Sequence, residues 1–153
     1  SIGQTTNNFL LTCRYIKQLK AMTINIFKKI ILLQVFIFLS TIILFIVEQT
    51  YFPYEEIDSQ VSLIEVSLFI LLFILTPFMW YFLYKLKPIG KKLFILNLIL
   101  GAVTYLVISE NSYLVTSVNP LTRFLDLMEN VLILLDGVIL AFLFFTDVKE
   151  KFE

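Results

Sequence analysis

Four long apolar runs, separated by short polar segments, dominate this chain of 153 residues. They cover about 30–47, 63–84, 93–108 and 127–146, and roughly 20 helical residues are enough to cross a hydrocarbon core of about 30 Å. Apolar residues make up 59% of the chain and charged residues 16%, against about 25% charged residues in a soluble domain. The runs are continuously apolar and do not alternate as barrel strands do. The sequence therefore predicts an all-α polytopic membrane protein with four transmembrane helices in an antiparallel bundle.

The charges between the runs sort by sign. Lysines lie before the first run, between the second and third, and after the fourth, whereas the segment after the first run is acidic. Lysine and arginine beside a span mark the cytoplasmic side of a membrane. We therefore expect a multi-pass protein in the lipid bilayer of the bacterial cytoplasmic (inner) membrane, with both termini cytoplasmic. The lysines are Lys28, Lys29, Lys85, Lys87, Lys91, Lys92, Lys149 and Lys151, and the acids are Glu48, Glu55, Glu56 and Asp58.

The first 21 residues differ from the rest of the chain. Residue 1 is serine, and the first methionine, Met22, is followed by a short polar lead, two lysines and the first apolar run. The sequence predicts a single transmembrane domain over 22–153, with 1–21 as a non-native or disordered extension. The alternative is a basic amphipathic helix at the membrane surface, with apolar residues such as Phe9 and Tyr15 facing the lipid.

Two connecting segments contain turn-forming residues. Lys87-Pro88-Ile89-Gly90 predicts a tight turn, because proline presets φ and glycine permits a positive φ. Asn119-Pro120 is typical of a helix start, with Asn119 as the N-cap and Pro120 at the first helical position. The fourth helix is then expected to begin before its apolar run, outside the hydrocarbon region.

One carboxylate lies inside an apolar run. Asp136 precedes the charged end of the fourth run at Asp147 by 11 residues, which is about 16 Å of helix and roughly half of the hydrocarbon thickness. An aspartate at the centre of a spanning helix costs about 2.5–3.5 kcal/mol on insertion scales, and each apolar neighbour returns about 0.3–0.6 kcal/mol. The helix can insert, but Asp136 is expected to face protein, and an intramembrane carboxylate is a candidate functional site.

The residues around Asp136 define a candidate polar site. Asp126, Glu129 and Asp136 fall on one side of a 3.6-residue helix, and Arg123 can pair with Asp126 one turn later. Glycines let neighbouring helices approach closely, and helix packing is expected at Gly101 and Gly137. The polar residues predicted at similar depth, as partners of Asp136, are Ser40, Thr41 and Thr104, with Thr76 and Asn97 nearer the inner side.

The composition excludes several kinds of chemistry. The chain has no histidine and a single cysteine, Cys13, so neither a histidine-based metal or haem site nor a cysteine cluster is expected. There is no phosphate-binding glycine loop and no catalytic triad. The net charge of zero gives no indication of nucleic-acid binding. We expect no enzyme activity, and no cofactor, metal or nucleic acid.

The stretch from Leu135 to Phe152, LDGVILAFLFFTDVKEKF, resembles the end of a group of small, uncharacterised four-span bacterial inner-membrane proteins. The likeness lies in the Asp-Gly pair of the last span and in the aromatic, lysine-containing ending. It implies a four-span inner-membrane protein, and no activity comes with it. In size and topology alone, the chain is also similar to immunity proteins of pore-forming bacteriocins.

Three functions follow as hypotheses. The leading one is a membrane protein that acts through helix association, with itself as a homo-oligomer or with a larger membrane partner, in which Asp136 holds the fourth helix on its neighbours. The second is a small proton- or cation-coupled transporter or channel, in which Asp136 titrates and Glu129 and Asp126 form an outer vestibule. The third is immunity against a pore-forming bacteriocin.

Overall fold

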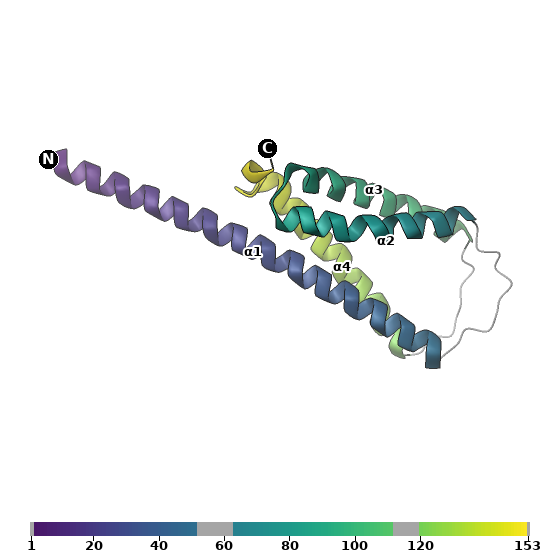
Figure 1. Cartoon of the computed structure of the whole chain (residues 1–153). Helices are drawn as coiled ribbons and strands as arrows, with labels where there is room; N and C mark the ends of the chain where they lie inside the picture. Colours follow the sequence, from purple (N-terminus) through teal and green to yellow (C-terminus); the bar gives the residue numbers. More distant parts are fainter. Residues whose placement is uncertain (1, 52–62, 112–119, 153) are drawn as a thin grey trace.

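A computed structural model describes residues 2–51, 63–111 and 120–152, with side chains for 16, 18–51, 63, 64, 66–106 and 121–152. The described residues form α1 (Ile2–Tyr51), α2 (Leu63–Tyr84), α3 (Pro88–Asn111), α4 (Pro120–Phe145) and a 3-10 turn, η1 (Lys149–Lys151) (Figure 1). Each of the four α-helices contains a stretch long and apolar enough to span a membrane. The all-α class and the four candidate spans are thereby confirmed, and they indicate a multi-pass membrane protein.

The bounds of α2 and the start of α4 agree with the prediction. α2 covers the predicted range 63–84, and α4 begins at Pro120, as predicted. The expected cap Asn119 and the acidic segment 55–58 lie outside the described residues. Glu48, which the charge pattern assigned to a loop, is instead in the last turn of α1 and only 1% exposed.

α1 is much longer than the predicted first span. It has 50 residues, or about 75 Å of helix at 1.5 Å per residue, more than twice the thickness of the hydrocarbon core. Residues 2–21 are helical and continue directly into the apolar part of α1. The side chains of Phe9 and Tyr15 lie outside the described set, and the assignment of 1–21 to a non-native extension stays a prediction.

The four helices form two pairs (Figure 1). α1 lies along α4 and α2 lies along α3, whereas much less contact joins one pair to the other. The pairs meet at the end where α2 turns into α3, and they diverge toward the C-terminal ends of α1 and α3. An antiparallel bundle packed along its whole length stays a prediction. We call the end where the two pairs meet the closed end. The largest buried apolar side chains belong to it: Phe27, Ile31, Met79, Leu83, Phe94, Ile139 and Leu143.

The connection between α2 and α3 differs from the predicted turn. α3 begins at Pro88, where the fixed φ of proline suits the first helical position, and the residue with a positive φ, 54°, is Leu86. Gly90 lies inside α3 without a positive φ. A Cβ at Gly90 would lie 2.7 Å from the backbone nitrogen of Leu83 and 2.7 Å from the carbonyl carbon of Phe82. The predicted role of Gly90 in the turn is therefore wrong: this glycine is needed because two helix backbones touch.

Lysines from two different helices contact aromatic rings at the closed end. The Lys28 ammonium of α1 lies 5.2 Å from the centre of the Tyr84 ring on α2. The Lys91 ammonium of α3 lies 4.4 Å from the centre of the Phe144 ring on α4. Each such cation–π contact is worth about 0.5–1 kcal/mol at exposed sites. The basic start of the first span, the basic α2–α3 connection and the end of α4 therefore lie together.

Candidate functional site

Asp136 is hydrogen-bonded to a residue of α1. Its Oδ1 accepts a hydrogen bond from Gln34 Nε2 at 2.5 Å, and Gln34 Oε1 accepts one from Trp80 Nε1 at 2.9 Å. Gln34 is 3% exposed and Trp80 is 8% exposed, so the bond between them is buried, whereas the bond from Gln34 to Asp136 is partly buried. Two consecutive hydrogen bonds thus join α2, α1 and α4 within their apolar stretches, with Trp80 in the last turns of α2.

Trp80 fixes the direction of these two hydrogen bonds. An indole N–H can only donate, so the carboxamide oxygen of Gln34 turns toward it. The carboxamide nitrogen of Gln34 consequently faces α4, where the carboxylate of Asp136 accepts. Phe38 packs edge-on against the indole, with ring centres 5.1 Å apart, a favoured aromatic arrangement. Asp136 therefore faces the carboxamide nitrogen of Gln34, and the carboxamide cannot flip to present its oxygen to Asp136 without losing the bond to Trp80.

A cavity of about 900 Å³ lies between the two helix pairs. We call it the interpair cavity. Its walls are mostly apolar, and Asp136 is the one charged residue among the described residues that line it. In the described part of the chain Oδ2 of Asp136 has no hydrogen-bond partner, so one carboxylate oxygen is engaged by α1 and the other is not. The lining comes from all four helices and includes Gln34, Phe73, Thr76, Asn97, Gly101 and Asp136.

The hydroxyl groups predicted to be partners of Asp136 bond within their own helices. Ser40, Thr41 and Thr104 each donate to the carbonyl oxygen four residues earlier, at 2.8–2.9 Å. This back-bonding is a usual way for a helical serine or threonine to satisfy its hydroxyl. The structure does not bring these three residues to Asp136. Thr76 and Asn97 do line the interpair cavity, with Thr76 Oγ1 3.3 Å from Asn97 Oδ1.

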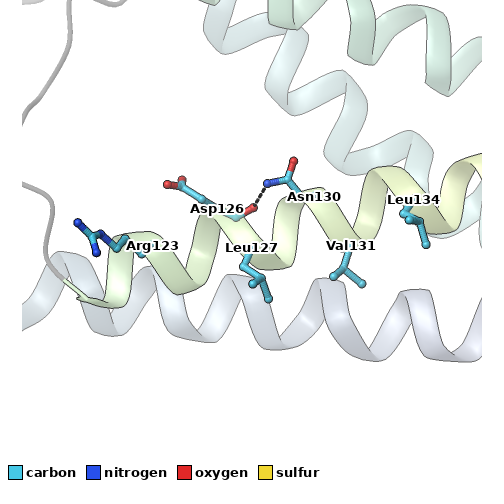
Figure 2. A pocket seen from close by; sticks show the side chains of 6 residues that line it. All are labelled: Arg123, Asp126, Leu127, Asn130, Val131 and Leu134. Atoms are coloured by element: carbon cyan, nitrogen blue, oxygen red, sulfur yellow. Dashed lines mark hydrogen bonds between the residues drawn. The ribbon is translucent and has the colours of Figure 1, made fainter.

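The predicted outer acids lie nearer the start of α4. Asp126 borders a smaller hollow of about 380 Å³, beside Arg123 and Asn130 (Figure 2). Asn130 donates to the Asp126 backbone carbonyl at 2.9 Å. Among the described residues no ion pair joins Arg123 to Asp126, and both are exposed, where such a pair is worth at most about 0.5 kcal/mol. That predicted pairing is wrong. Glu129 is also exposed.

The two glycines expected at helix contacts have open space around them. A Cβ at Gly101 or at Gly137 would meet nothing within 4 Å, in contrast to Gly90. Both line the interpair cavity, so their missing side chains widen it. Close helix approach at these glycines is not found within the described chain, and contact with a further helix stays a prediction.

Polar contacts between α1 and the C-terminal segment that contains α4 and η1 recur at a fixed interval. Fourteen residues separate neighbouring contacts along each of the two segments. Fourteen residues are two heptads, the repeat of helices that coil around one another. The order of contacts is reversed on the second segment, so α1 and α4 run in opposite directions. The three pairs are Lys20–Glu150, Gln34–Asp136 and Glu48–Thr122, at 2.9, 2.5 and 2.5 Å.

Gln34 and Trp80 are site residues that the sequence analysis missed. Gln34 is the one carboxamide in the first apolar run, whose other polar residues are the hydroxyl-bearing Ser40 and Thr41, and this marks it as a candidate partner for an intramembrane carboxylate. Its fourteen-residue distance from Glu48 equals that between Thr122 and Asp136. That equal spacing is the signal that could have paired the two segments.

The chemistry available to this site follows from its geometry. No protein-family model, curated protein or solved structure matches the chain, so the resemblances described above stay predictions. Within the described residues no group of three or more His, Cys, Asp or Glu could hold a metal ion. One carboxylate oxygen without a partner, in an apolar cavity, can exchange a proton or attract a cation.

Proposed function

We propose that this protein is a small cation-binding transporter or channel without enzyme activity, and that Asp136 is the group that binds the cation or proton. The observation that supports the proposal most is that Asp136 lines the interpair cavity while its Oδ2 has no hydrogen-bond partner among the described residues. Helix packing is served by Oδ1 and Gln34 alone, and it needs no cavity at the second oxygen. The geometry therefore favours the second of the three functional hypotheses.

We further propose that both termini face the cytoplasm of a bacterium, in its inner membrane. The support is the gathering of Lys28 and Lys91 at the closed end of the helix pairs, since lysines beside spans mark the cytoplasmic side. With this orientation the diverging ends of the pairs face outward. A cation would then enter the interpair cavity from the outer side and meet Asp136 near the middle of the bilayer.

The proposal is tested by ion flux in liposomes that contain the purified protein and a pH-sensitive dye. Addition of Na⁺, K⁺ or the quaternary cation tetraethylammonium outside is expected, for at least one of these cations, to change the internal pH faster than in protein-free liposomes. Asp136→Asn keeps the hydrogen-bond acceptor for Gln34 but cannot ionise, so we expect it to lower the rate at least tenfold. Asp147→Asn makes the same chemical change at an exposed residue after α4 and should leave the rate unchanged.

Two results would overturn the proposal. One is a wild-type rate no greater than that of protein-free liposomes. The other is an Asp136→Asn rate equal to that of the wild type, with circular dichroism and gel filtration showing that the variant is folded.

Helix association, with a second copy or a larger membrane protein, is a second candidate function. The observation in its favour is the open space at Gly101 and Gly137, on two helices that face the same cavity. Small residues let a further transmembrane helix approach closely. This candidate requires that a methyl group at either glycine disturbs the assembled protein in the membrane.

A further inference from the structure

The interpair cavity is lined by aromatic side chains from three helices. Phe38 belongs to α1, Phe69, Phe73 and Trp80 to α2, and Tyr105 to α3. The face of an aromatic ring attracts a cation, by about 0.5–2 kcal/mol according to how far the cation is desolvated. Together with apolar walls and few polar groups, this lining is typical of a site for an organic molecule.

The charge of the cavity has a single sign. Asp136 is its one acidic residue, and no Lys or Arg occurs among the described residues that line it. The other polar side chains of the lining, such as Thr76 and Asn97, are neutral. A ligand that balances this site therefore carries one positive charge, placed within reach of Oδ2 of Asp136.

The remainder of the cavity indicates that the cation has a large apolar body. A metal ion such as Ca²⁺ takes about 6–8 oxygen ligands, which a site with one carboxylate does not offer. A bare inorganic ion would also leave most of the apolar wall without contact. The volume of about 900 Å³ falls within the roughly 300–1,000 Å³ of pockets that enclose drug-sized molecules.

We infer that the interpair cavity binds a lipophilic organic cation, an amine or quaternary onium with an aromatic or alkyl body, whose charge is held by Asp136 and the surrounding rings. This inference rests on the proposed function, because it names the class of cation that Asp136 would bind. The carboxylate supplies the charge selectivity, and the aromatic walls select for an apolar body.

The test is equilibrium binding of tetraphenylphosphonium to the full chain in lipid nanodiscs. Tetraphenylborate, which has the same shape and the opposite charge, is the matched probe, and empty nanodiscs correct for partition into lipid. We expect the wild type to bind the cation at least tenfold more tightly than the anion. Asp136→Asn should remove most of that preference, whereas Asp147→Asn should keep it.

A second variant keeps the inference falsifiable if Asp136→Asn does not fold. Phe73→Leu retains the carboxylate and the apolar character of the wall, and it should weaken tetraphenylphosphonium binding about two- to tenfold through the lost ring.

Equal binding of both probes by the wild type would overturn the inference. If tetraphenylphosphonium does not bind while Asp136-dependent Na⁺ or K⁺ flux persists, the ligand class is wrong and the proposed function stands. If binding and flux are both absent, both proposals fail.

Discussion

The two helix pairs of this protein are aligned by different means. α2 and α3 are neighbours in the chain, joined by a turn at 85–87, and their backbones touch at Gly90. α1 and α4 are separated in sequence by the whole α2–α3 pair, and polar contacts at fourteen-residue intervals join α1 to the C-terminal segment. A short turn fixes the register of the first pair, whereas side chains have to fix the register of the second.

This difference gives the polar residues of a mostly apolar protein a structural role, which is to select the register of α1 against α4. Apolar helices slide along one another with little change in contact, and a polar pair at a core position selects one register. The middle contact, Gln34–Asp136, also carries the unpartnered oxygen of the candidate site. The same hydrogen bond therefore aligns α1 with α4 and positions the carboxylate of Asp136.

The largest effect is expected where the α1–α4 alignment is broken at its centre. Gln34→Leu removes the acceptor of Trp80 and the donor of Asp136 together, and each stranded buried group costs about 1–3 kcal/mol. We expect unfolding in detergent, followed by circular dichroism, to show a loss of about 2–6 kcal/mol. Asn130→Leu, at an exposed amide that bonds within its own helix, should change stability by less than about 0.5 kcal/mol. Equal stability of Gln34→Leu and the wild type would contradict the proposed alignment.

A smaller effect is expected where the α2–α3 pair is disturbed. Gly90→Ala places a methyl group 2.7 Å from backbone atoms of α2, and overpacking of this kind costs about 1–3 kcal/mol. Gly101→Ala, with nothing within 4 Å, is the matched control and should stay within about 0.5 kcal/mol in the same unfolding assay. If Gly101→Ala destabilises the protein in native membranes, a further helix packs there, as the helix-association function requires.

The smallest effect belongs to the exposed end of the α1–α4 alignment. The hydrogen bond from Lys20, and then its charge, hold the pKa of the Glu150 carboxyl below its ordinary value of 4.5. Because the folded pKa is lowered, this contribution is present above about pH 4.5 and is lost as the pH falls through the folded pKa. The melting temperature of Glu150→Gln should therefore fall less than that of the wild type between pH 6 and pH 3. An identical fall in both would show that the pair does not contribute.

The sequence predicted the helices far better than their pairing. The thickness of a bilayer sets the length and apolarity of a spanning helix, and both can be recognised in a sequence. The bounds 63–84 of α2 and the start of α4 at Pro120 were predicted correctly. The role of Gly90 was predicted wrongly because the distance between α2 and α3 cannot be predicted from local sequence. Local sequence also does not show that α1 lies along α4, since no turn joins them.

The candidate site was predicted at one residue and missed at its partners. Asp136 stands out because a charge in an apolar run is costly. Ser40 and Thr41 were predicted to match it in depth, but Asp136 bonds to Gln34, six residues before Ser40 in α1, and the two hydroxyl groups are satisfied by their own helix carbonyls. The longer carboxamide of Gln34 reaches across to α4. The predicted depth on α1 was therefore displaced by nearly two helical turns, and the orientation that Trp80 imposes is visible only in three dimensions.

The hydrogen bond between Gln34 and Asp136 has a consequence for synthesis of the chain. Its two residues lie 102 positions apart, and ribosomes add about 5–20 residues per second, so the carboxamide waits roughly 5–20 s for its acceptor. Trp80, made earlier, occupies only the carboxamide oxygen during that delay. A nascent chain that stops before the last helix retains an unsatisfied amide in its first one. Completion of the last helix supplies the acceptor for this amide.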